Sequence, residues 1–156
     1  MAIDAHPHAM ADASRRSRRQ KLANLLLVAA RAEELPSELD RVADGVTIHF
    51  PWGSLLAGLL NVDESGVAAS LARITRPGCD VKVVLSLTER ERALGLPLLD
   101  RSLEGRLATR YAAHGLELAE WRPASQQEIA DTRSSWAKRL GADKGRQAWL
   151  LRLVRV

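Results

Sequence analysis

The order of apolar and polar segments is the feature that most restricts the fold of this chain. Short apolar runs, each suited to one strand, alternate with longer stretches of helical character. This alternation is typical of an α/β sheet with helices on both faces. With 156 residues and no linker long enough to divide it, the chain is expected to form a single domain over residues 1–156.

The apolar runs predict the strands, and the segments between them predict the helices. We expect strands at 2–4, 25–30, 46–50, 81–87, 116–121 and 149–156, and helices at 7–21, 36–43, 63–75, 101–114 and 126–131. The run from Leu25 to Ala30 is apolar throughout and therefore predicts a strand buried on both faces. Asp63 is the expected cap of its helix, and the last two strands fit an antiparallel hairpin at the sheet edge.

Several protein classes are excluded by composition. The run at 25–30 is far too short to span a bilayer. Asp4, His6 and His8 interrupt the N-terminus, which therefore lacks the apolar core of a secretory signal. Cys79 is the only cysteine, so no internal disulfide or cysteine-based metal site can form. The four histidines have no metal-binding spacing, and solvent or packing positions are expected for them. We expect a cytoplasmic protein without a metal.

Positive charge is clustered along the chain. The net charge is +4, and the first basic cluster comprises Arg15, Arg16, Arg18, Arg19 and Lys21. A second comprises Lys138, Arg139, Lys144 and Arg146. Clustering of this kind is expected where a protein binds phosphates. For either cluster alone, a solvated helix face is the alternative.

Two carboxylates stand where predicted strands end. In doubly wound sheets, ligands bind beyond the carboxyl ends of the strands. Asp4 ends the first strand, where a carboxylate commonly accepts hydrogen bonds from ribose hydroxyls, and Glu33 follows the second. A capping or turn role for Asp4, and a surface position for Glu33 before Pro36, are the alternatives.

Two tryptophans lie in segments suited to contact a nucleobase. Trp52 follows a predicted strand between Pro51, which fixes φ, and Gly53, which permits a sharp turn. Trp136 lies in a polar segment beside Lys138 and Arg139. Tryptophans beside basic residues suit stacking on a base, while a core position is the alternative for Trp52.

Three segments of the sequence resemble one enzyme family. They are FPWGSLL at 50–56, GLPLL at 95–99 and SWAKRL at 135–140. In order and spacing they are similar to the kanamycin–apramycin resistance 16S rRNA methyltransferases, which methylate N1 of adenine 1408 in the decoding A site. The likeness runs from Ala2 to the end of the chain. It implies a class I (Rossmann-like) α/β methyltransferase fold with S-adenosyl-L-methionine as the methyl donor.

The resemblance also assigns roles to individual residues. It implies that Trp52 and Trp136 sandwich the flipped adenine. It implies that Asp4 binds the cofactor ribose, and that Glu33 and Ser54 lie near the cofactor. The RNA contacts it implies are Arg15, Arg16, Arg18, Arg19, Lys21, Arg139, Lys144 and Arg146. Adenine N1 is hidden in a paired base, so the base must be flipped out. Its lone pair needs no general base, which leaves positioning as the main task of the protein.

The sequence departs from the family pattern in two places. No Gly-rich loop follows a strand, and the chain begins at what would be the second strand of the family fold. We therefore expect an N-terminally truncated domain that lacks the first strand and its loop; a start codon assigned too far downstream is one explanation. The stretch 88–94 is shorter than in the family, so Glu89, Arg90 and Arg92 are expected to be a solvated charge run.

Three functions remain open from the sequence. The first is methylation of 16S rRNA in the small ribosomal subunit by a monomer. The second is a non-catalytic RNA-binding remnant of such an enzyme. The third is a methyltransferase of the same fold with another substrate.

Overall fold

The structure, a computed structural model, describes residues 1–61, 66–133 and 147–156. In chain order its elements are β1 (Ala2–Asp4), α1 (Pro7–Arg19), β2 (Leu27–Ala29), the 3₁₀ helix η1 (Ser37–Leu39), β3 (Val46–His49), α2 (Gly53–Leu60), α3 (Val67–Ile74), β4 (Asp80–Leu85), α4 (Glu89–Ala93), α5 (Leu103–Ala112), β5 (Leu116–Pro123), α6 (Gln126–Asp131) and β6 (Trp149–Arg155). The strands form one sheet of β1 and β2 and a second in the order β3-β4-β6-β5. The expected α/β class is confirmed.

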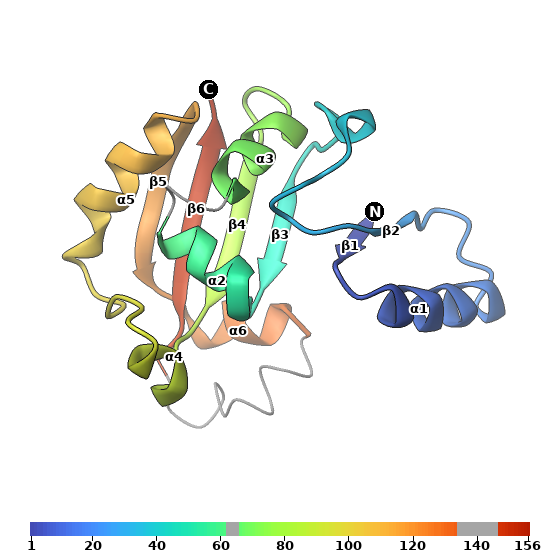
Figure 1. Cartoon of the computed structure of the whole chain (residues 1–156), viewed down its shortest axis with the longest axis horizontal. Helices are drawn as coiled ribbons and strands as arrows, with labels where there is room; N and C mark the ends of the chain where they lie inside the picture. The colour runs from blue at the N-terminus through green and yellow to red at the C-terminus, as the bar shows by residue number, and fades with distance from the viewer. Residues whose placement is uncertain (62–65, 134–146) are drawn as a thin grey trace.

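The larger sheet is mixed (Figure 1). Strands β3 and β4 pair in parallel, with Ile48 opposite Val83. Strand β6 is antiparallel to β4 on one side and to β5 on the other. The antiparallel hairpin expected from the last two strands is therefore confirmed, with β5 at the edge.

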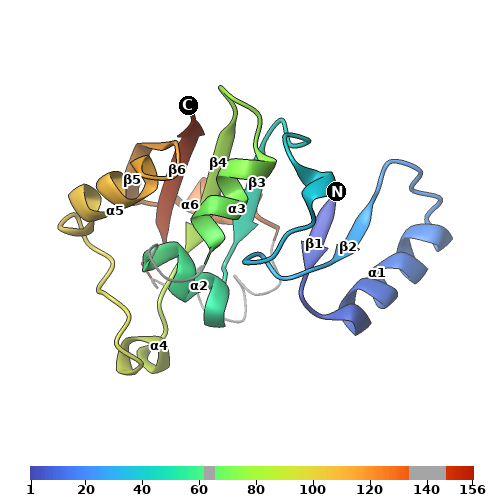
Figure 2. The ribbon, with the colours of Figure 1, turned by 45° about the horizontal axis from the view of Figure 1, so that its top comes forward.

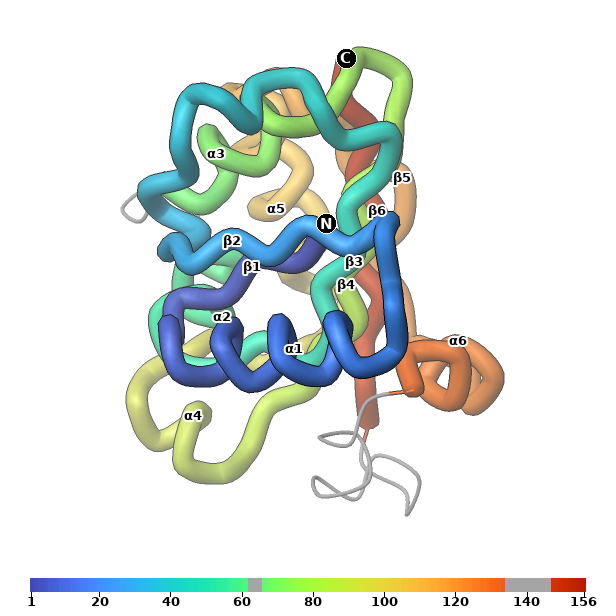
Figure 3. Tube along the Cα trace, turned by 90° about the vertical axis from the view of Figure 1, so that its right-hand side faces the viewer, coloured from blue at the N-terminus to red at the C-terminus, as the bar shows by residue number. Residues whose placement is uncertain are grey.

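Helices lie on both faces of the larger sheet, as expected. Figure 3 shows α2, α3 and α5 on one side of the sheet and α6 on the other. The main core lies under the first group, where Leu56, Leu107 and Leu151 are fully buried. A smaller apolar cluster under α6 contains Phe50 and Ile129.

The smaller sheet lies beside the free edge of β3. Figure 2 shows β1 between β2 and β3, with β1 and β3 running in the same direction. Within the described ranges no ladder joins β1 to β3, so each has an unpaired edge on the side that faces the other. The carboxyl ends of both strands consequently lie at the same end of the molecule.

The structure corrects several local expectations. The strand expected at 25–30 is shorter, because β2 comprises only Leu27–Ala29, and Leu25 and Leu26, which precede it, are 36% and 58% exposed. Strand β2 is not buried on both faces: Leu27 and Val28 are half-buried and Ala29 is exposed, since β2 is the outer strand of a small sheet. Helix α3 begins at Val67 with Gly66 as its N-cap, while Asp63, the expected cap, lies outside the described residues. The helix expected at 36–43 is a single 3₁₀ turn.

Two helices were not expected from the sequence. Helix α2 is apolar over most of its surface, so it has no polar face that marks its periodicity. Helix α4 has only 5 residues, and a capping box defines its start. The Thr88 side chain accepts from the N–H of Glu91, and the Glu91 carboxylate accepts from the N–H of Thr88.

Candidate functional site

The candidate site lies at the carboxyl ends of β1, β2 and β3. Asp4 ends β1, Glu33 follows β2, and Trp52 follows β3. Ligands of α/β sheets bind in this position. The structure thus brings together the predicted site residues that come from different strands.

Asp4 organises the turn between β1 and α1. Its Oδ1 accepts a hydrogen bond from the backbone N–H of His6 at 2.8 Å and lies 3.3 Å from His6 Nδ1. The backbone N–H of Ala30 donates to the Asp4 carbonyl at 3.1 Å, which ties the end of β2 to the end of β1. The turn role considered for Asp4 is therefore present, and both side-chain contacts use only Oδ1.

Glu33 is held against the starts of two helices. Burial raises the pKa of its carboxyl group, but its own backbone N–H, the Ser54 hydroxyl and the Arg31 charge outweigh burial and hold the pKa below its usual value. Its backbone carbonyl accepts from Ser70 Oγ at 3.3 Å. The Glu33 side chain is only 15% exposed, so it is not the surface residue considered as the alternative.

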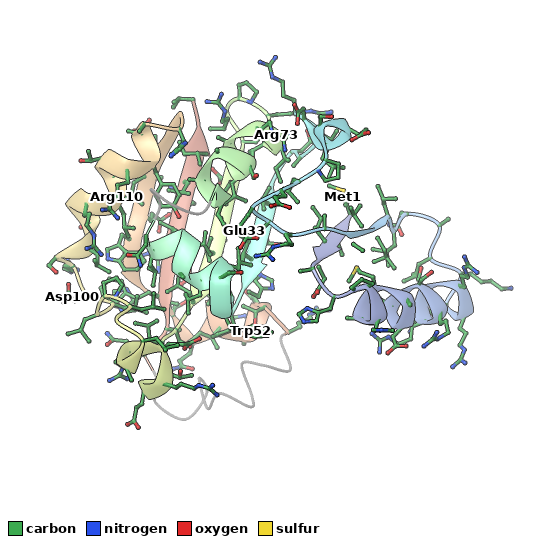
Figure 4. The ribbon with its side chains drawn as sticks, viewed as in Figure 1. Met1, Glu33, Trp52, Arg73, Asp100 and Arg110 are labelled. Carbon is green, nitrogen blue, oxygen red and sulfur yellow. The ribbon has the colours of Figure 1, made fainter. Side chains whose placement is uncertain are left out.

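One oxygen of this carboxylate has no protein partner. Glu33 Oε1 is buried and makes no hydrogen bond to the described chain. A buried acceptor without a partner costs about 1–3 kcal/mol. Figure 4 shows Glu33 close to α2, on the side of the larger sheet that α2 covers. A ligand with a hydrogen-bond donor would satisfy Oε1 there.

Trp52 is exposed and backed by a rigid segment. Its side chain is 60% exposed, which rules out the core position considered for it. Phe50 is 3% exposed and has φ +49°, a conformation that is strained for a bulky residue. Gly53 follows with φ +60° and starts α2. The buried Phe50 ring and the start of α2 therefore fix the backbone on both sides of Trp52.

The first basic cluster lies on and just after α1. Arg15, Arg16, Arg18, Arg19 and Lys21 are all exposed. Arg15 pairs with Asp12 one turn earlier. Arg16, Arg18 and Arg19 occupy the last turn, where positive charge also stabilises the helix dipole. Solvation and helix stability thus account for part of the cluster, and its exposure leaves it accessible to phosphates.

The other residues predicted to be functional either lie away from the candidate site or fall outside the described residues. Glu89, Arg90 and Arg92 lie on the exposed surface of α4, as expected for a solvated charge run. The remaining predicted RNA and base contacts lie outside the described residues: Trp136, Lys138, Arg139, Lys144 and Arg146. Their roles stay predictions.

A separate depression lies at the opposite end of the sheet. It has a volume of about 360 Å³ and is lined by Arg73 and Arg155 among others. Figure 4 shows Arg73 at the far end of the molecule from Trp52. Arg155 donates to the carbonyls of Ala72 and Gly115, and Arg73 pairs with Asp40, so these guanidinium groups hold chain segments together.

Metal-binding and membrane-spanning features are absent from the described ranges. No group of three or more His, Cys, Asp or Glu side chains there is arranged around a common metal position. No helix in that part of the chain has the length and apolar character needed to cross a bilayer.

One residue of the site, His6, was not predicted from the sequence. Its imidazole ring lies against the indole of Trp52, with ring centroids 6.2 Å apart and planes inclined at 30°. A histidine two residues after a strand-terminal Asp and directly before Pro7 is a weak local signal. The ring that it meets, Trp52, follows a strand of the other sheet as the N-cap of α2, and no sequence spacing reveals this contact.

The fold and the site together define an α/β methyltransferase-like class. A family profile described as NpmA, 16S rRNA (adenine(1408)-N(1))-methyltransferase, matches residues 1–155. The chain belongs to this family. An rRNA methyltransferase of Saccharopolyspora hirsuta is 35% identical over 127 residues, covering 78% of this chain and 80% of the relative. A 16S rRNA (adenine(1408)-N(1))-methyltransferase of Streptoalloteichus tenebrarius is 33% identical over 156 residues, covering 94% of this chain and 71% of the relative.

Solved structures agree with this assignment. A variant of the 16S rRNA (adenine(1408)-N(1))-methyltransferase of Catenulisporales acidiphilia, determined with its cosubstrate SAM, matches with a TM-score of 0.82 and 28% identity. The match covers 99% of this chain and 73% of that one. The 16S rRNA methyltransferase KamB matches with a TM-score of 0.80 and 31% identity, covering 99% of this chain and 76% of that one. The expected Rossmann-like methyltransferase fold is confirmed.

Proposed function

We propose that this protein transfers a methyl group from S-adenosylmethionine to N1 of an adenine in the decoding A site of 16S rRNA. The observation that carries the proposal is the exposed indole of Trp52, held by a strained, buried backbone at the edge where Asp4 and Glu33 also lie. Family membership over residues 1–155 supports the same reaction. We propose the small ribosomal subunit as the partner and a monomer as the acting species.

The described residues fit an adenosine-containing cofactor. The cofactor supplies an electrophilic methyl group on a sulfonium centre. Asp4 Oδ2, which is not used by His6, is the oxygen that ribose hydroxyls would approach. The buried Glu33 Oε1 lacks a donor that the adenosine part can provide, and Ser54 adds a hydroxyl at the start of α2.

The protein's own contribution to the reaction is positioning. The target adenine must leave its stack for N1 to be reached, and stacking on an aromatic side chain offsets about 1–3 kcal/mol of that cost per base. Trp52 provides one stacking plane, and we propose Trp136 as the second. With the cofactor bound, the lone pair of neutral N1 would form the bond to the methyl carbon as the bond from that carbon to sulfur breaks and its electrons stay on sulfur. The residues of the site would therefore have to hold N1 in line with that bond, and no general base is required. The exposed basic side chains of α1 bind the surrounding phosphates, and we propose the same role for Arg139, Lys144 and Arg146.

A primer-extension assay on small ribosomal subunits tests the proposal. N1 methylation blocks the Watson–Crick edge of the base and stops reverse transcriptase. We expect a stop at the A-site adenine after incubation with protein and S-adenosylmethionine, and no stop without the cofactor. Methylation at a different nucleotide, with none at the A site, would contradict the assignment.

A second function is favoured by the unpaired edges of β1 and β3. In the described chain no ladder joins the two sheets, so β1, which ends at Asp4, has no backbone hydrogen bonds to β3. This arrangement fits a non-catalytic protein that binds ribosomal RNA through α1 and Trp52. Calorimetric titration of the 156-residue chain with S-adenosylmethionine separates the two: micromolar affinity supports the enzyme, and binding of ribosomal subunits without cofactor binding supports the alternative.

A further inference from the structure

Asp4, His6 and Trp52 form a continuous series of contacts from the end of β1 to the segment that follows β3. Asp4 Oδ1 accepts from the His6 backbone at 2.8 Å and lies 3.3 Å from His6 Nδ1. The His6 ring then lies against the Trp52 ring at a centroid distance of 6.2 Å with planes at 30°. This distance is within the range of offset aromatic pairs.

Core packing does not force this contact. The His6 side chain is 67% exposed and that of Trp52 is 60% exposed. The backbone conformation at each residue instead sets the position from which its side chain extends. His6 is the N-cap of α1 and precedes Pro7, which favours the extended conformation found at His6, with φ −97° and ψ 104°. Trp52 is the extended N-cap of α2, with φ −143° and ψ 169°.

We propose that His6 is a positioning residue that sets the plane of the Trp52 indole for the target base. The inference rests on the proposed function, in which Trp52 stacks on the flipped adenine. One face of the indole lies toward the imidazole, so the opposite face is the one offered to the base. Asp4 holds the imidazole in turn, through the hydrogen bond to its backbone and the contact with Nδ1.

The physical effect is pre-organisation. An exposed tryptophan samples several rotamers, and a base that stacks on it must select one of them. A neighbouring ring that holds the indole in one orientation lowers the entropy lost when the base binds. The contribution of His6 is therefore expected in the use of ribosomal RNA and not in cofactor affinity, although Asp4 connects the two regions.

The first test measures the contact itself. Proton resonances of the His6 imidazole are recorded by NMR in the full chain and in Trp52→Ala. We expect the indole ring current to shift the His6 resonances, and this shift to disappear in Trp52→Ala. Identical His6 resonances in both proteins would overturn the proposal. This measurement does not depend on methylation, so it separates failure of the contact from failure of the proposed function.

The second test measures the consequence. Affinity for small ribosomal subunits and kcat/KM for their methylation are compared for His6→Ala, His6→Phe and the control His8→Ala, an exposed histidine on the same helix. We expect His6→Ala to lower both by about fivefold, the size expected for one aromatic pair. His6→Phe, which keeps a ring, should recover most of the loss, while cofactor affinity stays within about twofold in all variants.

Two results of the second test would overturn the proposal. The first is wild-type subunit affinity and kinetics in His6→Ala. The second is an equal loss in His6→Phe and His6→Ala, because a general distortion of the α1 start would affect both alike. If the wild-type chain binds subunits but does not methylate them, the proposed reaction fails, and subunit affinity alone decides the role of His6.

Discussion

At the scale of single residues, exposure separates the role of Trp52 from that of the core. We predict that Trp52→Ala changes the free energy of unfolding by less than about 0.5 kcal/mol, as is usual for surface substitutions. The same change should lower affinity for small ribosomal subunits by about tenfold or more, since base stacking contributes about 1–3 kcal/mol. Urea denaturation and subunit binding measure the two effects. A loss of stability comparable to that of Tyr111→Phe would show that the indole is structural.

Tyr111 is a buried aromatic residue and contrasts with the exposed Trp52. Its side chain is fully buried, and its hydroxyl donates to the Leu59 carbonyl at 2.8 Å, which joins α5 to the end of α2. Burial raises the pKa of this phenol well above its usual value, so the donor form persists at all ordinary pH values. We predict that Tyr111→Phe lowers the free energy of unfolding by about 1–2 kcal/mol, because the carbonyl loses its partner. Urea denaturation at neutral pH measures this loss.

The ionisation of Glu128 makes the free energy of unfolding depend on pH. It accepts a two-point hydrogen-bonded ion pair from Arg122 at 2.8 and 2.9 Å. The pair, with a smaller effect of the Ser125 contacts, outweighs burial and lowers the Glu128 pKa from 4.5 to about 2. A folded-state pKa below the unfolded value stabilises the protein, with the full contribution present above about pH 4.5 and lost progressively as the pH falls through about 2.

We therefore predict that Glu128→Gln lowers the free energy of unfolding at pH 7 by about 1 kcal/mol, a value reduced because Arg122 is partly solvated. The difference between the variant and the wild type should shrink as the pH falls through about 2 and vanish below it. Denaturant unfolding at several pH values measures it, with the exposed Glu117→Gln as a control that changes stability by less than about 0.5 kcal/mol. A difference that does not vary with pH would contradict the ion-pair explanation.

At the scale of elements, the start of α3 limits the position of Glu33. Gly66 has φ +71°, and a Cβ at this residue would lie 3.1 Å from the Glu33 carbonyl oxygen. We predict that Gly66→Ala lowers the free energy of unfolding by about 1–2 kcal/mol, because an L side chain is strained at this φ. It should also weaken cofactor binding by displacing Glu33. Thermal unfolding and calorimetric titration measure the two effects.

Gly105 provides a control of opposite sign. It lies in α5, and a Cβ there would meet nothing within 4 Å. Gly105→Ala should raise the free energy of unfolding by about 0.5–1 kcal/mol through helix propensity alone. If both substitutions stabilised the protein, the close approach at Gly66 would have no energetic consequence.

The sequence predicts a helix well where hydrophobic periodicity and capping residues indicate the same bounds. Helix α6 has the predicted bounds, and a capping box from Ser125 to Glu128 defines its start. Helix α2 was missed because burial on most sides removes the polar face. The burial of β2 was predicted wrongly because an apolar run does not reveal whether a strand has neighbours on both sides.

The sequence predicted those residues of the candidate site that directly follow or end a strand. Asp4 and Trp52 lie where the ends of β1 and β3 place them, and this is a local property of the sequence. The Glu33–Ser54 contact and the His6–Trp52 contact each join segments that tertiary packing brings together. No local pattern specifies which side chains meet in such contacts.

At the scale of the whole molecule, the first basic cluster lies at one end of the protein, on and just after α1. Figure 1 shows α1 and α5 at opposite ends of the protein. We predict that Arg16→Ala, Arg18→Ala and Arg19→Ala each reduce the salt dependence of RNA binding, because each variant neutralises fewer phosphates. The slope of log K against log salt should fall by about 0.7–0.9 for every phosphate that is no longer bound. Filter binding over a range of salt concentrations measures this slope, and Arg106→Ala, an exposed residue on α5, should leave it unchanged.

The His6–Trp52 pair is one of the contacts that join the small sheet to the segment after β3, and this has a thermodynamic consequence. A ligand that engages Asp4 acts on the element that carries His6, and a base that engages Trp52 acts on the other sheet. Coupling free energies are reciprocal. If bound cofactor raises the affinity for RNA by some factor, bound RNA must raise the affinity for the cofactor by the same factor. The free energy of the ternary complex is therefore the same whichever ligand binds first.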